Sequence, residues 1–248
     1  MDDISGFLDQ PDGARLAWRR IDGAGPTVIW LGGFMSDMTG TKAEALSDWA
    51  IANGRAYVRF DYFGHGASSG QFRDGTVTRW RADALAVIDD LTEGDLVLVG
   101  SSMGGWIACL AAMARPQRVK AMVLIAPAPD FTERLMTPEI SPAGHAALAA
   151  EGVWMRPSDY GEPYPITRNL LEDGARWSIL GGDPIPIEVP VHILQGGQDP
   201  DVPWRHALEL AQALKGDDVV FTLIKDGDHR LSRPGDIARL IATVADVS

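Results

Sequence analysis

The feature that most constrains this chain is a regular alternation of short apolar runs with amphipathic segments. The apolar runs have the length and composition of buried strands: Thr27–Leu31, Ala56–Phe60, Leu96–Gly100, Val119–Ala126, Val191–Gln195 and Val219–Ile224. The segments between them place apolar residues at helical spacing: Lys42–Asn53, Val77–Leu91, Met103–Arg115, Pro203–Leu214 and Ile237–Val244. Such alternation is typical of the α/β class, with a mostly parallel central sheet and helices on both faces. Arg15–Arg20 adds a predicted earlier, more exposed strand.

Composition excludes several kinds of partner and site. The chain has 248 residues and a net charge of −12, so nucleic acid and anionic membranes would repel it. Cys109 is the single cysteine, which rules out an internal disulfide and a cysteine-based metal site. The sequence has no run of about 20 apolar residues and begins Met-Asp-Asp-Ile-Ser, unlike a signal or transit peptide. We therefore expect a cytoplasmic protein that does not span a membrane.

Residues 127–187 interrupt the alternation. They hold nine of the sixteen prolines, and only Ala143–Ala150 and Ile166–Leu171 have short helical patterns. An insertion that leaves the carboxyl end of a core strand lies near the ligand crevice of an open α/β sheet. Its apolar aromatic residues favour a cap over a site, the alternative being a surface insertion without a catalytic role: Trp154, Tyr160, Tyr164 and Trp177. The predicted division is a core of residues 1–126 and 188–248 with a cap of residues 127–187.

The clearest chemical signal is Gly100-Ser101-Ser102-Met103-Gly104. A predicted strand precedes it and a predicted helix follows, which is the setting of a nucleophile elbow. The turn is so tight that side chains two residues to either side of the serine would collide, so glycine is needed there. The sequence therefore predicts Ser102 as the nucleophile of acyl transfer.

A serine hydroxyl needs a general base, and the base needs a carboxylate that orients it. In this fold the acid and then the histidine follow the serine along the chain. Asp199 comes just after the predicted strand Val191–Gln195, and His229 comes just after Val219–Ile224. Both side chains therefore belong to the same edge of the sheet, and the predicted catalytic set is Ser102, Asp199 and His229.

The same reaction needs two N–H donors for the negative oxygen of the intermediate. One is expected from Met103, the residue after the nucleophile, and the other from Phe34, in the loop after Thr27–Leu31. The segment Gly64-His65-Gly66 does not match a dinucleotide-binding loop, and no phosphate loop or metal-ligand spacing is present. We therefore expect a reaction without cofactor or metal.

Other candidate residues near the same loops have simpler roles. Asp201 precedes a predicted helix and is expected to cap it. Asp226 and Asp228 are expected to face solvent or brace the loop of His229. Cys109 is expected in the core, and His65 is a weak candidate for the lining of a pocket.

Together these residues resemble the α/β-hydrolase superfamily over essentially the whole chain. Several segments are more closely similar to mitochondrial abhydrolase-domain esterases that cleave acyl-glucuronides and depalmitoylate proteins: Asp61-Tyr62-Phe63-Gly64-His65-Gly66-Ala67-Ser68, Val99–Trp106, Gly152-Val153-Trp154, Asp228-His229-Arg230 and Lys42 in Gly40-Thr41-Lys42-Ala43. The resemblance implies the same triad, Ser102, Asp199 and His229. Because no transit peptide is evident, it suggests a bacterial relative of these enzymes.

The predicted activity is that of a serine esterase or thioesterase acting on a small-molecule or acyl-protein ester. We expect Gly33, Met35, Trp154 and Arg168 to contact substrate. A cap arginine would suit a substrate carboxylate such as a glucuronate, whereas the apolar residues would suit a fatty acyl chain. Two alternatives remain open: a lactonase or peptidase with the same triad, and a ligand-binding protein without catalysis.

Overall fold

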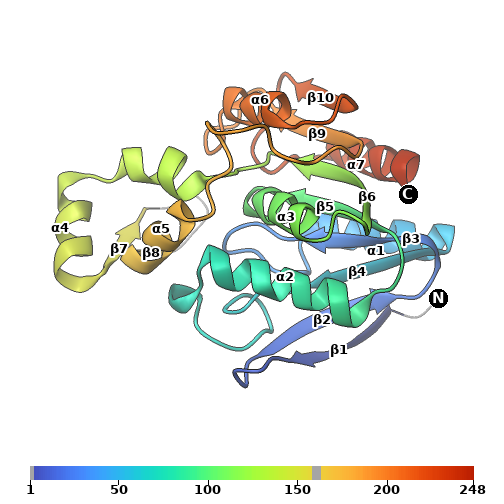
Figure 1. Ribbon diagram of the computed structural model, residues 1–248, viewed down its shortest axis with the longest axis horizontal. Helices are drawn as coiled ribbons and strands as arrows, with labels where there is room; N and C mark the ends of the chain where they lie inside the picture. Colours follow the sequence, from blue (N-terminus) through green and yellow to red (C-terminus); the bar gives the residue numbers. More distant parts are fainter. Residues whose placement is uncertain (1–2, 158–162) are drawn as a thin grey trace.

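The computed structural model describes residues 3–157 and 163–248. Its centre is an eight-stranded sheet with the order β1-β2-β4-β3-β5-β6-β9-β10 (Figure 1). Its strands are β1 (Asp3–Asp9), β2 (Arg15–Ile21), β3 (Ala24–Leu31), β4 (Arg55–Phe60), β5 (Leu96–Ser101), β6 (Val119–Ile125), β9 (Val191–Gly196) and β10 (Val219–Ile224). From β4 to β10 all neighbouring strands are parallel, and β1 and β2 form an antiparallel edge. The α/β-hydrolase fold predicted from the sequence, with its mostly parallel sheet, is confirmed.

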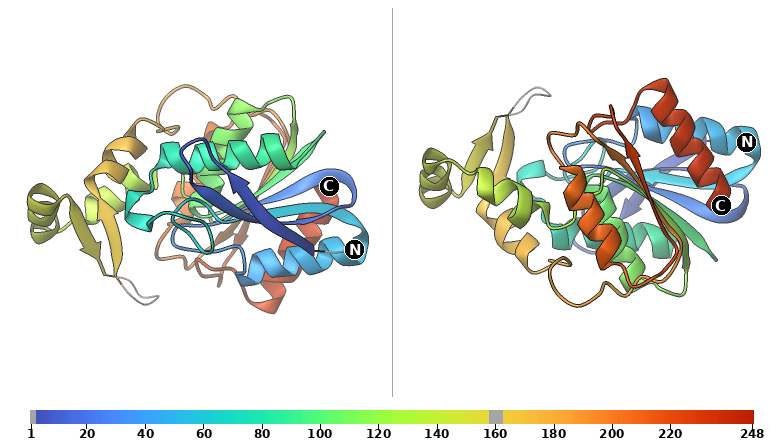
Figure 2. Two further views of the ribbon diagram at one scale, coloured as in Figure 1. Left: turned by 90° about the horizontal axis from the view of Figure 1, so that it is seen from below. Right: turned by 90° about the horizontal axis from the view of Figure 1, so that it is seen from above.

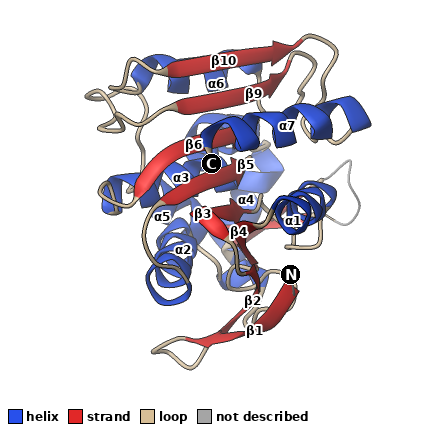
Figure 3. Cartoon of the chain, turned by 90° about the vertical axis from the view of Figure 1, so that its right-hand side faces the viewer, coloured by secondary structure: helices blue, strands red, loops and turns tan. Residues whose placement is uncertain are grey.

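Helices cover both faces of this sheet, as Figure 3 shows. Two lie on one face, α1 (Thr41–Asn53) and α7 (Pro234–Val247). Three lie on the other, α2 (Val77–Leu91), α3 (Met103–Ala114) and α6 (Trp204–Ala213). Side chains alternate across the strands, so Leu96 and Leu98 pack against the second group while Val97 and Val99 pack against the first. This burial on both sides explains why the strand sequences are continuously apolar.

Strand β1 was not predicted from the sequence. Its side chains are exposed or half-buried, and it pairs with β2 at the edge of the sheet. Because none of its side chains is buried, no apolar pattern is imposed on β1, and its sequence resembles a polar amino-terminal segment. The predicted strand Arg15–Arg20 is present as β2.

The segment between β6 and β9 projects from one end of the sheet, away from both termini (Figures 1 and 2). It contains two short non-α helices, η2 (Thr132–Met136) and η3 (Thr137–Glu139), followed by α4 (Pro142–Glu151), a two-stranded sheet and α5 (Arg168–Ala175). The strands of that sheet are β7 (Val153–Arg156) and β8 (Tyr164–Thr167). The bounds 127 and 187 of the cap stay a prediction.

Two details of this segment differ from the sequence interpretation. The helical pattern at Ala143–Ala150 is confirmed as α4, but the one at Ile166–Leu171 is wrong in its first part. There Ile166 and Thr167 belong to β8, and α5 begins only at Arg168, where the Thr167 hydroxyl caps the helix by accepting the Leu170 N–H. Neither strand of the small sheet alternates apolar and polar residues, so no pattern identifies β7 or β8 from the sequence. Tyr160, one of the predicted cap aromatics, lies outside the described residues.

Buried carboxylates hold the base of the projecting segment: Asp130 joins its two ends, and Asp173 joins it to the core. Asp130 accepts the backbone N–H groups of Ile179 and Leu180 at 2.9 and 2.8 Å. Asp173 accepts both the N–H and the hydroxyl of Thr78, at the start of α2. These contacts fix where the segment leaves and rejoins the sheet. Among the described residues, no helix is both long enough and apolar enough to cross a bilayer.

Candidate active site

Ser102 lies in a sharp turn between β5 and α3. Its φ of 55° and ψ of −120° are unusual for a residue with a side chain. The turn is held by its backbone: the Ser102 N–H donates to Ile125 O, and the Ser102 carbonyl accepts N–H groups from Gly105 and Ala128. An unusual backbone conformation that several hydrogen bonds hold in place is typical of functional positions.

Glycines give this turn the room it needs. A Cβ added at Gly100 would lie 2.4 Å from the Gly104 carbonyl oxygen, and one at Gly104 would lie 2.0 Å from that of Leu31. A Cβ at Gly33 would lie 3.4 Å from the Cβ of Ser102. The requirement for glycine on both sides of the serine, predicted from the sequence, is therefore confirmed.

Asp199 lies just after β9 and is almost completely buried. Its Oδ1 accepts the N–H groups of Asp201 and Val202 at 2.9 and 2.8 Å. Its Oδ2 accepts the side-chain amide of Gln195 at 3.1 Å and is 2.8 Å from His229 Nδ1. Four donor groups thus converge on one carboxylate and fix its orientation.

Gln195 is a functional residue that the sequence analysis missed. Its side chain is fully buried, and its Nε2 also donates to the carbonyls of Gly196 and Val202. Because three oxygens surround this nitrogen, the amide has one acceptable orientation, and its Oε1 is left without a partner. The available sequence signal was a glutamine at the end of a predicted buried strand, four residues before the predicted acid.

His229 joins the acid to the serine. It lies in the loop between β10 and α7, and its Nε2 is 3.1 Å from the Ser102 Oγ. Asp199, His229 and Ser102 therefore form a continuous chain of hydrogen bonds, with the histidine between the carboxylate and the hydroxyl. The structure brings together the three residues that the sequence order predicted.

The loop that carries His229 is braced by acidic residues and by α1. Asp228 Oδ1 accepts the Leu231 N–H, and Asp226 pairs with Arg233 at 2.8 Å, so the bracing role predicted for both acids is confirmed. From α1, Lys42 Nζ donates to the Arg230 carbonyl. From the sequence alone, Lys42 stands out only as part of a resemblance.

A cavity of about 480 Å³ opens at Ser102 and His229. Besides the ion pair of Arg156 and Glu139, the projecting segment contributes mainly apolar residues to its wall: Ala128, Phe131, Leu135, Met136 and Tyr164. The loop after β3, the start of α1 and the loop of His229 contribute more polar ones: Ser36, Asp37, Thr41, Lys42, Arg230 and Ser232. This volume lies within the range of small-molecule sites.

The loop after β3 lies directly against Ser102. Gly33, Phe34 and Met35, all predicted to serve the site, line the cavity. Ser36 closes a turn here, since both its N–H and its hydroxyl donate to the Gly33 carbonyl. The ring of Phe34 packs edge-on against four other rings, in both the core and the projecting segment: Phe72, Trp80, Phe131 and Tyr164. Packing on all sides holds the Phe34 backbone in place.

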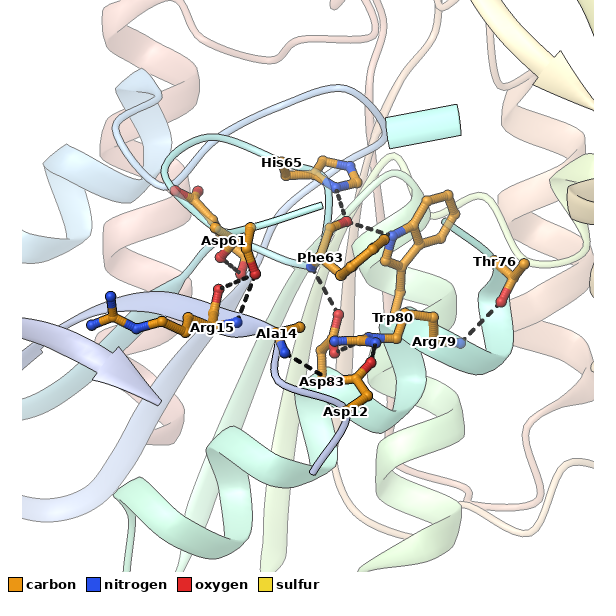
Figure 4. A network of polar contacts seen from close by, with 12 residues as sticks. Asp12, Ala14, Arg15, Asp61, Phe63, His65, Thr76, Arg79, Trp80 and Asp83 are labelled. Atoms are coloured by element: carbon orange, nitrogen blue, oxygen red, sulfur yellow. Dashed lines mark hydrogen bonds and ion pairs between the residues drawn. The ribbon is translucent and has the colours of Figure 1, made fainter. Parts of the chain in front are cut away.

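The loop after β4 supports this arrangement from behind. Asp61 accepts the N–H of Met38 at 2.7 Å and that of Ala67 at 2.8 Å, which joins the loops after β3 and β4. Figure 4 shows His65 beside Trp80, with its Nδ1 3.1 Å from the Phe63 carbonyl oxygen. His65 does not line the cavity. Its burial lowers the pKa to about 4, so it is a neutral packing residue.

Two residues predicted to contact substrate lie elsewhere. The Trp154 ring packs beside α4, with its Nε1 3.1 Å from where a Cβ at Gly144 would be, and does not line the cavity. Arg168 donates to the carbonyls of Leu148 and Ala149, at the end of α4. A guanidinium satisfies the unpaired carbonyls of a helix terminus well, and neither contact could be read from the sequence.

The predicted cap role of Asp201 is also wrong. Helix α6 begins after Pro203, which makes no side-chain cap, while Asp201 lines the cavity. Cys109 is fully buried in the core, as predicted, and burial raises its pKa to about 12. Within the described ranges, one group of acidic and histidine side chains has metal-like proximity, namely Asp199, Asp201 and His229. Because the Asp199 carboxylate already accepts four donor groups, it is poorly suited to an ion.

Comparisons with known proteins agree with this arrangement. The model of the alpha/beta hydrolase family matches residues 8–240. The chain is 40% identical over 243 residues to the mitochondrial palmitoyl-protein thioesterase ABHD10 of Bos taurus. The matched region covers 97% of this chain and 79% of that protein.

Solved structures give the same picture. A putative hydrolase from Agrobacterium vitis superposes with a TM-score of 0.93 at 47% identity, over 99% of this chain and 98% of the other. Alpha/beta hydrolase domain-containing protein 10 from mouse superposes with a TM-score of 0.90 at 36% identity. The superposition covers 98% of this chain and 97% of the mouse chain. The chain is an enzyme of the alpha/beta hydrolase family.

Proposed function

We propose that this protein is a serine hydrolase that cleaves carboxylic esters or thioesters through an acyl-enzyme on Ser102. The observation that carries the proposal is the hydrogen-bond chain from Asp199 through His229 to the Ser102 hydroxyl, with distances of 2.8 and 3.1 Å. These are the distances that a nucleophile and its general base require. The names of the relatives, which are thioesterases, support the choice of acyl bond.

In the proposed reaction, His229 Nε2 takes the proton from Ser102 Oγ as that oxygen attacks the acyl carbon. The histidine then gives the proton to the leaving alcohol or thiol, and the acyl group stays on the serine. A water molecule, activated by the same histidine, releases the acid and restores Ser102. Asp199 holds His229 in the tautomer that presents Nε2 to the serine and offsets the positive charge of the imidazolium.

The backbone N–H groups of Phe34 and Met103 are the proposed donors to the negative oxygen of the intermediate. Met103 is the first residue of α3, where an N–H has no acceptor within the helix and the helix dipole favours negative charge. The Phe34 backbone is held beside Ser102 by the turn at Gly33 and by the packed ring. Gly33 and Met35 are proposed substrate contacts because they line the cavity.

The apolar wall given by Phe131, Leu135 and Met136 suits the acyl part of a substrate, and a fatty acyl thioester is the preferred candidate. The relatives named palmitoyl-protein thioesterases support it. An acyl-glucuronide is an ester that the same triad would cleave, so it belongs to the same proposal. The predicted cytoplasmic location stays a prediction, since these relatives are named mitochondrial.

The test is a kinetic panel with a nitrophenyl butyrate, palmitoyl-coenzyme A, an acyl-glucuronide, a lactone and a peptide. Ser102→Ala should lower kcat at least about 10³-fold and abolish labelling by a fluorophosphonate probe. Ser5→Ala, on the exposed edge strand, is the matched control and should behave as wild type.

Persistent labelling of Ser102→Ala would refute the assigned nucleophile. A strong preference for the lactone or the peptide would overturn the substrate class. A complete lack of turnover by the wild type would favour a ligand-binding protein.

A further inference from the structure

The loop Lys225–Arg233, here called the histidine loop, has no helix or strand of its own. Leu231, two residues after His229, has a φ of 44°, so the chain turns sharply there. The braces given by Asp226, Asp228 and Arg233 all come from this loop or from α7, which follows it directly. The loop after β9 holds the first half of the histidine loop, where the Gln198 N–H donates to the Gly227 carbonyl, so a further contact at Arg230 acts on the half that follows His229.

Lys42 supplies a contact from a different part of the fold. It is the second residue of α1, and its Nζ donates to the Arg230 carbonyl oxygen at 2.5 Å. Arg230 directly follows His229, and 188 residues separate the two partners. This hydrogen bond therefore ties the histidine loop to a helix on the face of the sheet where α1 and α7 lie.

The surroundings of Lys42 are unfavourable for a lysine. It is partly buried at the cavity, and this burial lowers its pKa to about 8. It also lies in the first turn of α1, where the helix dipole disfavours a cation. Its hydrogen-bond acceptor is a neutral carbonyl. Positions that violate local preferences in this way are usually functional.

We propose that Lys42 is a positioning residue, which holds the histidine loop so that His229 stays within reach of Ser102. The proposal rests on the serine-hydrolase function proposed above. A charged ammonium makes a stronger hydrogen bond to a carbonyl than a neutral donor does. Because proton transfer depends on sub-ångström placement, fixing the peptide next to the histidine has a direct effect on kcat.

The charge of Lys42 makes this role sensitive to pH. Asp228 in the histidine loop and Asp236 in α7 favour its protonated form, while Arg230 opposes it. Below a pH of about 8 the ammonium is present, and its charge is lost as the pH rises through that value. The wild-type kcat should therefore decline above a pH of about 8, as the hydrogen bond to Arg230 weakens.

The experiment compares Lys42→Met and Lys42→Arg with wild type on nitrophenyl butyrate, a small neutral substrate. Lys42→Met should lower kcat by about 10- to 100-fold, with KM changed less than about threefold. Lys42→Arg stays charged over the whole pH range of the assay. The pH at which its kcat declines should therefore be at least about one unit higher than for wild type. Lys120→Met, at an exposed lysine of β6, is the matched control and should equal wild type.

Three results would overturn the inference: a kcat of Lys42→Met within about twofold of wild type, a change in KM alone, or the same alkaline decline in wild type and Lys42→Arg. Circular dichroism checks the fold of each variant. If Lys42→Met fails to fold, the pH profiles of wild type and Lys42→Arg decide.

Ser102→Ala separates this inference from the proposed function. Full activity of Ser102→Ala would overturn both proposals. An inactive Ser102→Ala beside wild-type behaviour of the Lys42 variants would overturn the role of Lys42 alone.

Discussion

The turn at Ser102 and the loops that carry Asp199 and His229 hold one chain of hydrogen bonds by different means. The turn joins two regular elements and depends on close backbone contacts, in which Gly104 lies against the Leu31 carbonyl. The two loops are irregular and depend on side-chain donors, such as Gln195 on Asp199 and Lys42 on the histidine loop. Adding atoms to the turn should therefore destabilise the fold. Removing or altering a hydrogen-bonding side chain in the loops should instead lower catalytic activity.

The largest effect on activity is expected from Asp199→Asn. An asparagine keeps the shape of the side chain, but its amide group can present an N–H to His229 Nδ1, which then favours the wrong tautomer. We expect kcat to fall by about 10⁴-fold while the turn at Ser102 stays intact. The measurement is kcat with nitrophenyl butyrate.

The control for Asp199→Asn is its thermal midpoint. The Asp201 and Val202 N–H groups still need an acceptor, so a large loss of stability would mean that Asp199 holds its loop more than it serves His229. That result would contradict the comparison, because it would make the carboxylate a mainly structural group.

Gly104→Ala tests the turn at Ser102, where close backbone contacts leave no room for added atoms. The added methyl carbon would lie 2.0 Å from the Leu31 carbonyl oxygen and 2.5 Å from that of Gly32, and backbone atoms cannot move aside cheaply. We expect a loss of about 3 kcal/mol or more in the free energy of unfolding, measured by urea denaturation. Gly235→Ala, in α7 with open space around its Cβ, is the matched control and should be neutral or slightly stabilising.

The same contrast explains what the sequence could and could not predict. The turn at Ser102 is local, since its strand, its glycines and its helix follow one another along the chain, and the structure has them as predicted. The positions of Asp199 and His229 followed from a general rule on strand ends. No local pattern indicated that Lys42 would reach Arg230, because 188 residues lie between them.

The projecting segment shows the same limit. The prolines and the length of residues 127–187 predicted an insertion. They did not predict the two four-residue strands β7 and β8 within it. Trp154 and Arg168 were placed at the substrate by chemical type alone. In the structure they serve α4 instead, through packing at Gly144 and hydrogen bonds to Leu148 and Ala149. Which side of a small insertion faces the cavity depends on tertiary packing, which residue type does not reveal.

The smallest effect is expected from Gln195, and it refines the comparison because the turn is untouched. Gln195→Leu removes the amide that donates to Asp199 Oδ2, so the carboxylate can shift relative to His229. We expect kcat to fall about 10-fold, which corresponds to about 1.4 kcal/mol, near the lower end for one hydrogen bond to a charged group.

Gln195→Glu is the more discriminating variant because it keeps the shape of the side chain. A buried carboxyl about 3 Å from another has a raised pKa, and in its protonated form it can still donate to Asp199. As the pH rises through that pKa the new group becomes an anion beside Asp199, so kcat should decline with pH relative to wild type. Parallel pH profiles for Gln195→Glu and wild type would mean that Gln195 only fills space. In that case the hydrogen bond from Gln195 would not position Asp199, and Lys42 would be the remaining side chain that holds these loops.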